Sequence, residues 1–175
     1  MTTEHKMYIL FGLTTLVILG GGVFFLSNQQ TEQIKKEQSP FAGVEMPMEG
    51  RNHVPEGTDI EYKSNPPHSG PHYAITAHAG VYDKAPEDGN LVHSLEHGAV
   101  ILWYDEDLAK EDVEKLKTIF TKMPGKTILT PRKGMDMPVG VTSWTRILKL
   151  EKIDEQKILE FYNANYNRAP ENAPI

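Results

Sequence analysis

Residues 93–97, His-Ser-Leu-Glu-His, run directly into an apolar segment that starts after Gly98. Asp88 and Asn90, which stand just ahead of them, are residue types that commonly begin helices, and glycine is the residue that most often follows a helix end. The six residues after Gly98 are apolar, β-branched or aromatic, as in a buried strand. The pattern predicts a short helix that leads at once into a strand.

The helix assignment decides whether two histidines in this segment can act together. On a helix, His93 and His97 stand one turn apart on one face, with their backbones about 6 Å apart, so both imidazoles can reach one ion. In a strand they would lie roughly 13 Å apart, which is too far for a joint ligand role. A shared metal site at these two residues therefore requires the helix.

The N-terminal part of the chain contains a candidate membrane anchor. Residues 8–26 are uncharged, rich in Ile, Leu, Val and Phe, and about as long as a helix that crosses a bilayer. A cleaved secretory signal is the alternative, but its basic region would offer only Lys6, and no small-x-small cleavage site follows. We expect a short cytoplasmic N-terminus at residues 1–7, a single-pass transmembrane anchor at 8–26, a polar spacer at 27–39, and an extracytoplasmic domain at 40–175 in a protein of the cell membrane.

The order of apolar patterns in the last part of the chain predicts the fold. We expect strands at 59–63, 126–130 and 139–150, a helix from Asp105 or Asp107 to Met123, and a helix from Asp154 to just before Pro170. Such an order is typical of an α+β domain, with a mainly antiparallel sheet and helices on one face, here preceded by one N-terminal transmembrane helix.

Composition limits the kinds of partner. The formal net charge is −6, so the basic surface that nucleic acid requires is not expected. The chain has no cysteine, which rules out disulfides and thiolate zinc sites. A metal site would have to use ligands other than thiolates.

The H-x-x-E-H pattern of His93, Glu96 and His97 also occurs in zinc peptidases, where two histidines bind zinc and the glutamate activates water. A peptidase of this kind needs a downstream glutamate as third ligand, but Glu160 falls within a predicted helix and Glu171 in a proline-bounded tail. The alternative is structural, because histidines near a helix C-terminus can bind nearby carbonyls.

Six of the chain's seven histidines fall between residues 53 and 97, and this concentration favours metal binding over the structural alternative. Taken singly, His68 and His78 are more typical of solvated loops. Two M-x-M pairs, Met46 with Met48 and Met135 with Met137, would suit Cu(I), although ordinary packing explains methionines more simply.

The segment Pro66-Pro67-His68-Ser69-Gly70-Pro71-His72-Tyr73, followed by Leu91-Val92-His93-Ser94-Leu95-Glu96-His97-Gly98 and later by Ser143-Trp144-Thr145-Arg146, resembles the DUF3105 family of membrane-anchored bacterial proteins, a domain of unknown function. The resemblance implies that His53, His72, His93, Glu96 and His97 occupy motif positions. It also implies that His68 occupies a variable position and that Thr145 stands where a glycine is usual.

We therefore expect the domain to bind a transition-metal ion, copper or zinc, through His53, His72, His93 and His97, with Glu96 orienting an imidazole. One alternative is a metal-dependent hydrolase in which Glu96 is the catalytic general base. Another is a metal-free interaction module. The expected partners are the metal ion and the membrane, the latter through residues 8–26.

Overall fold

The computed structural model describes residues 15, 17–31 and 40–175, of which 17–31 are helical and 40–175 fold as a unit of their own. The predicted cytoplasmic N-terminus, part of the predicted anchor at 8–26 and most of the predicted spacer at 27–39 lie outside the described residues. Among the residues that are described, no helix is both long and apolar enough to cross a membrane.

Residues 40–175 contain strands and helices in mixed order. The elements are β1 (Val44–Glu45), β2 (Gly80–Val81), α2 (Asp88–Glu96), β3 (Val100–Asp105), α3 (Lys110–Phe120), β4 (Thr127–Arg132), β5 (Val139–Ser143), β6 (Arg146–Leu150) and α4 (Glu155–Asn165). The helices predicted around 88–97, 105–123 and 154–170 are all present. The predicted strand at 59–63 does not form, and 139–150 is a hairpin of two strands that turns at Trp144 and Thr145.

The sheet has the strand order β1-β6-β5-β3-β4-β2. Its pairings are antiparallel from β1 to β3, whereas β3 pairs parallel with β4 and β4 pairs parallel with β2. The α+β class is therefore confirmed, but the sheet is mixed where we expected a mainly antiparallel one. The reason is α3, which carries the chain back across the sheet between β3 and β4 and so makes these strands parallel.

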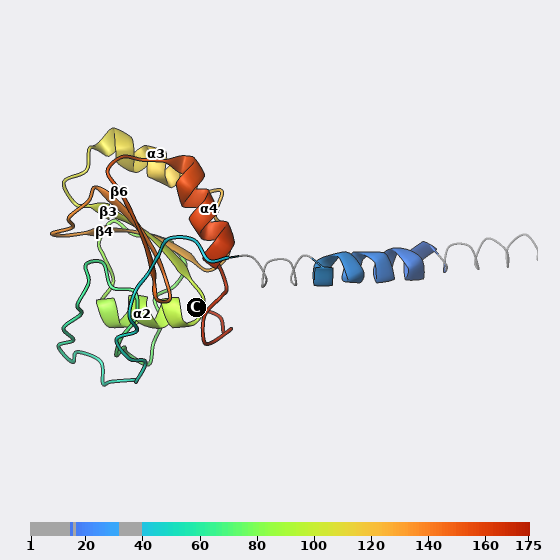
Figure 1. Ribbon diagram of the computed structural model, residues 1–175, viewed down its shortest axis with the longest axis horizontal. Coiled ribbons are helices and arrows are strands. Elements are labelled where there is room, and N and C mark those ends of the chain that lie inside the picture. Colours follow the sequence, from blue (N-terminus) through green and yellow to red (C-terminus); the bar gives the residue numbers. More distant parts are fainter. Residues whose placement is uncertain (1–14, 16, 32–39) are drawn as a thin grey trace, which may run out of the picture. The chain divides into compact units, whose positions relative to one another are not determined.

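Helices cover both faces of the sheet, and the expectation of helices on one face was wrong. Leu102 of β3 packs in a core with α3 and α4, whereas its neighbours Ile101 and Trp103 pack in a second core with α2. Figure 1 shows α2 on the opposite side of the sheet from α3 and α4. The uninterrupted apolar run of β3 fits this arrangement, because a strand that is buried on both faces has no polar side.

The junction between α2 and β3 forms as predicted. The Gly98 N–H donates to Leu95 O at 3.0 Å, and the Ala99 N–H donates to Ser94 O at 3.0 Å, which is the hydrogen-bond pattern of a Schellman helix end. Gly98 has φ +87°, and a Cβ at this position would lie 2.8 Å from Cα of Asn167. Glycine is therefore required both for the turn and for the close approach.

The start of α2 differs from the expectation. The residue that begins it is Glu87, whose side chain makes no capping hydrogen bond. Asp88 instead pairs with Arg132, and the side-chain amide of Asn90 donates to Ile75 O at 2.8 Å. The Asp88 side chain thus attaches α2 to β4, and the Asn90 side chain attaches it to the segment that precedes α2.

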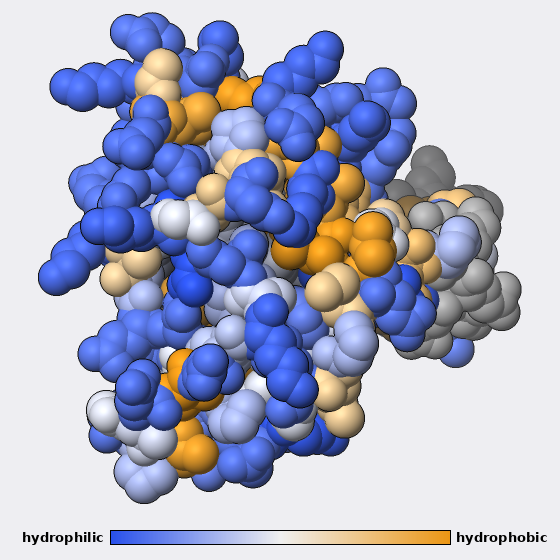
Figure 2. Space-filling model, turned by 60° about the vertical axis from the view of Figure 1, so that its left-hand side comes forward, coloured by the Kyte–Doolittle hydropathy of each residue, from blue (hydrophilic) through white to orange (hydrophobic). Residues whose placement is uncertain are grey.

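The surface of the domain is mostly hydrophilic on the face that Figure 2 shows, with apolar side chains exposed in bands between the polar ones. A mixture of this kind is ordinary for a protein surface in water. The chemically distinctive part of the domain lies around α2.

Candidate metal centre

Three imidazoles and one carboxylate converge beside α2. Each of His53, His72, His93 and Glu96 offers one ligand atom, and these atoms all lie within 4.8 Å of one another. His93 and Glu96 are three residues apart on α2, so the helix places them on the same face. His53 and His72 come from the irregular segment that precedes the helix.

A short parallel bridge between backbones holds His53 beside His72. The Val54 N–H donates to His72 O at 2.8 Å, and the His72 N–H donates to Asn52 O at 3.1 Å. The two ring centroids lie 4.8 Å apart. A segment rich in proline and glycine thus presents two imidazoles from fixed backbone positions.

The three imidazoles form a nearly equilateral triangle. The ring centroid of His93 lies 4.9 Å from that of His53 and 4.8 Å from that of His72. His72, Glu96 and His93 are buried, with 0, 1 and 6% of their surface exposed, whereas His53 is exposed. The group is therefore enclosed on the α2 side and open to solvent at His53.

The contact between His72 and Glu96 has a geometry that could hold a cation. Nδ1 of His72 lies 2.9 Å from Gly70 O, and because a carbonyl oxygen only accepts, Nδ1 must donate. In a neutral ring Nε2 then carries the lone pair. This Nε2 lies 2.9 Å from Oε2 of Glu96 without the alignment of a hydrogen bond. Two acceptor atoms so close together repel each other unless a positive charge lies between or beside them.

A second buried ring nitrogen is also without a partner. Nδ1 of His93 is buried and has no hydrogen-bond partner among the described residues. Buried polar atoms are nearly always satisfied, so an exception is a place where a water molecule, a ligand or an ion can bind. Nε2 of His72 and Nδ1 of His93 are thus both buried atoms to which the described protein atoms give no hydrogen bond.

The Arg51 side chain orients the carboxylate of Glu96. Its Nε donates to Oε1 of Glu96 at 2.7 Å, while Oε2 faces His72. The guanidinium is about half exposed, whereas Glu96 is buried. The ion pair therefore stabilises a buried carboxylate and leaves one of its oxygens available to a cation.

The surroundings of His93 favour its neutral form. Burial, together with the nearby rings of His97, His72 and His53, lowers the pKa of His93 from 6.5 to about 4, while Glu171 acts in the opposite direction. A neutral imidazole is the form that binds metal ions. At neutral pH the group therefore needs no deprotonation at His93 before it can bind an ion.

His97 lies beside the donor group rather than within it. Its ring centroid is 4.4 Å from that of His93, as the predicted helix requires. Its Nδ1 donates to Pro174 O at 2.8 Å, and its Nε2 lies 3.4 Å from Oε2 of Glu171. The converging group thus contains Glu96 in place of His97, whose ring nitrogens face the C-terminal tail.

Sequence reasoning assigned Glu96 only an orienting or catalytic role. The three-residue spacing of His93 and Glu96 could have indicated Glu96 as a metal ligand. On a helix, residues three apart share a face, as residues four apart do. The choice between Glu96 and His97 depends on the tail, which is distant in sequence.

Two further histidines and the second methionine pair lie outside the donor group. His68 is 1% exposed and contacts Ser69 Oγ at 3.0 Å, so its assignment to a solvated loop was wrong, whereas His78 is exposed as expected. Met137 is 3% exposed and Met135 packs against the core that contains Trp103. This pair has the packing role that sequence analysis favoured.

The chain belongs to the DUF3105 family, a protein family of unknown function, whose model matches residues 53–174. The resemblance noted in the sequence is thereby confirmed. The match contains the four converging donors and the tail as far as Pro174. Comparison with curated proteins and with solved structures gave no match.

Proposed function

We propose that this member of the DUF3105 family binds one transition-metal ion through His53, His72, His93 and Glu96. The observation that carries the proposal is the buried contact of 2.9 Å between Nε2 of His72 and Oε2 of Glu96, which lacks hydrogen-bond geometry. A metal ion would accept both lone pairs and remove their repulsion. It would also give the unpartnered Nδ1 of His93 a ligand role.

The spacing of the donors suits a small ion. Tetrahedral zinc holds nitrogen and oxygen ligands at about 2.0 to 2.1 Å, which places the ligand atoms roughly 3.4 Å from one another. The ligand atoms here all lie within 4.8 Å of one another, so the group must close slightly around the ion. His53 is the exposed member and can move toward the ion at least cost.

Three imidazoles and a carboxylate are ligands for zinc and for copper(II). These four donors include no thioether, and so give no preference for Cu(I). We therefore propose zinc or copper(II) as the bound ion.

The geometry favours binding over hydrolysis by the H-x-x-E-H mechanism. That mechanism requires His93 and His97 as joint ligands and a glutamate that is free to activate water. Here His97 is not among the four converging donors, and Glu96 is engaged with Arg51 and His72. A four-donor group of this kind is typical of a site that holds its ion rather than of one that turns over a substrate.

We further propose that the domain lies outside the cell and is held at the membrane by residues 8–26. The support is in the sequence, where this segment has nineteen uncharged, mostly apolar residues. A metal-binding domain in that position would meet ions before they reach the cytoplasm.

Elemental analysis tests the proposal, on the full chain purified without added metal and without a histidine tag. Thermal unfolding with excess zinc, with excess copper(II) and with chelator then measures how much metal binding stabilises the folded state. An ion that binds only the folded state raises its stability by about 2.7 kcal/mol at a hundredfold excess over Kd. His72→Ala should abolish this increment, whereas His78→Ala, at an exposed histidine, should retain it. Equal melting temperatures under all three conditions would leave the metal-free interaction module as the explanation.

A further inference from the structure

We propose that His97 and Glu171 form a second, outer cation position, through which the metal ion passes between solvent and the inner donor group. The inner donor group is His53, His72, His93 and Glu96. The inference rests on the proposed metal binding of that group and assigns a role to the two residues beside it.

The outer pair, His97 and Glu171, repeats the arrangement of His72 and Glu96, which we call the inner pair. In each, Nδ1 of a histidine donates to a backbone carbonyl, at 2.9 Å from His72 to Gly70 O and at 2.8 Å from His97 to Pro174 O. In each, Nε2 then faces a glutamate oxygen, at 2.9 Å for the inner pair and at 3.4 Å for the outer one. At both places Nε2 of a histidine faces a carboxylate oxygen, and a cation bound there would be held by both atoms.

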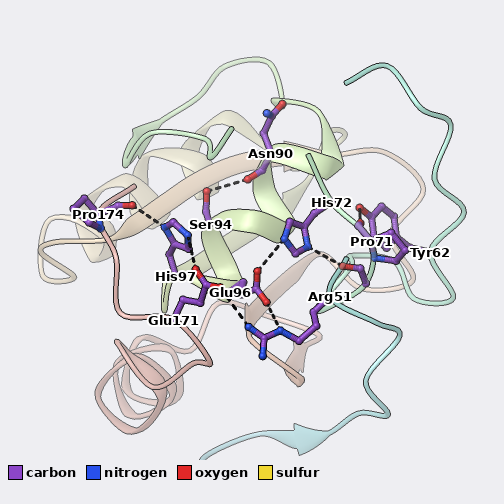
Figure 3. A network of polar contacts seen from close by, with 11 residues as sticks. Arg51, Tyr62, Pro71, His72, Asn90, Ser94, Glu96, His97, Glu171 and Pro174 are labelled. Atoms are coloured by element: carbon purple, nitrogen blue, oxygen red, sulfur yellow. Dashed lines mark hydrogen bonds and ion pairs between the residues drawn. The ribbon is translucent and has the colours of Figure 1, made fainter. Parts of the chain in front are cut away.

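The side chains of Arg51 and His93 connect the inner pair to the outer pair. Figure 3 shows Arg51 in contact with the carboxylates of Glu96 and Glu171. Its Nε donates to Oε1 of Glu96 at 2.7 Å and its Nη2 donates to Oε1 of Glu171 at 3.4 Å. The ring of His93 lies between the two histidines, 4.8 Å from the His72 centroid and 4.4 Å from the His97 centroid. An ion that leaves the outer pair therefore meets His93 next.

The two pairs differ in their access to solvent. The side chains of His72 and Glu96 are 0 and 1% exposed, whereas those of His97 and Glu171 are 12 and 43% exposed. Charges in contact with water interact more weakly than buried ones. The outer position should therefore bind a cation more weakly and exchange it faster, as an entry position requires.

Backbone contacts hold Glu171 in place independently of its carboxylate. The Glu171 N–H donates to Glu96 O at 3.1 Å, and Nζ of Lys126 donates to Ala173 O at 2.9 Å and to His97 O at 2.6 Å. Replacement of the carboxylate by an amide leaves these contacts intact. Glu171→Gln is therefore a selective test of the outer position.

The experiment is a calorimetric titration of the metal-free full chain with zinc chloride at neutral pH, together with stopped-flow measurement of zinc release to a chelator. We expect a tight binding event followed by a weaker one in the wild-type chain. Glu171→Gln should lose the weaker event, keep the tight one and slow zinc release. His97→Ala should do the same, with the far-ultraviolet circular dichroism of the wild type as evidence of folding.

Glu160→Gln is the matched control, because the Glu160 carboxylate accepts a hydrogen bond from Gln156 on the surface of α4, and this variant should behave as the wild type. A single event of unchanged affinity and release rate in the wild type and in Glu171→Gln would overturn the outer position and leave the inner site standing. Loss of the tight event in Glu171→Gln would also overturn it, because Glu171 would then belong to the inner site. A wild-type chain that binds no zinc and no copper(II) would instead contradict the proposed function itself.

Discussion

His53 and His72 are joined by a parallel backbone bridge, and their ring centroids lie 4.8 Å apart. Each belongs to the irregular segment between β1 and β2, whose conformation depends on few regular hydrogen bonds. A metal ion held by these rings and by α2 would connect this segment to the helix directly.

Metal binding should therefore protect the bridge from opening. We expect slower amide hydrogen exchange at Val54 and His72, whose N–H groups make the two bridge hydrogen bonds, when zinc is added to the metal-free chain. Mass spectrometry or NMR measures this. Amides in α3, on the other face of the sheet, serve as the control and should change less. An equal slowing of exchange at the bridge and in α3 would indicate that zinc stabilises the whole domain and does not act locally at the bridge.

Glu96→Gln tests whether this carboxylate is a ligand. The amide oxygen is uncharged and binds a cation less well, so metal affinity should fall by at least about tenfold, the size of effect seen even for groups that only support a ligand. Competition with a chromophoric chelator measures the affinity. Glu61→Gln, at an exposed position, is the control. Unchanged affinity together with loss of a measurable hydrolytic activity would instead support a catalytic base.

The depressed pKa of His93 predicts how the metal-free domain responds to acid. The folded state has a His93 pKa of about 4, compared with 6.5 when unperturbed, so between these pH values the unfolded chain binds more protons. The free energy of unfolding should therefore fall as pH drops through this window, by up to about 3 kcal/mol at roughly 1.4 kcal/mol per pKa unit. Urea unfolding with chelator present measures it. His93→Gln should have a flatter profile, and parallel profiles for the two chains would contradict the assignment.

Thr145 offers a test of backbone strain near the site. It has φ +58°, which is unfavourable for a β-branched residue. Its N–H donates to His68 O at 3.0 Å and its carbonyl accepts from the Met46 N–H at 2.9 Å, so the conformation is held from both sides. Thr145→Gly should raise the free energy of unfolding by about 1 kcal/mol. Thr145→Ala keeps a Cβ, so its free energy of unfolding should rise less. An equal rise in both variants would mean that loss of the threonine side chain, and not relief of backbone strain, causes the stabilisation.

The proposed topology rests on the apolar segment at residues 8–26 and is tested in cells. Protease added to spheroplasts should digest the domain at residues 40–175, while a tag placed ahead of Lys6 stays protected until the membrane is opened. Protection of the domain and loss of the tag would reverse the proposed orientation.

The amino-acid sequence by itself determined the elements whose signals are local. Helix α2, its end at Gly98 and the strand β3 follow from residues within a few positions of one another, since helix ends and apolar runs depend on near neighbours. The same local geometry placed His93 and His97 on one face. The family resemblance also singled out His53 and His72 among the histidines of the segment ahead of α2.

Tertiary structure decided which side chains meet. The His53–His72 bridge and the covering of His97 by the tail join residues that are distant along the chain, and no local pattern specifies such contacts. The parallel pairing of β3 with β4 likewise depends on how α3 packs on the sheet. Glu96 enters the donor group because the tail engages the His97 ring while Arg51 turns one carboxylate oxygen toward His72. The physical reason is that a donor group is defined by distances in space, and these are set by the packing of the whole domain.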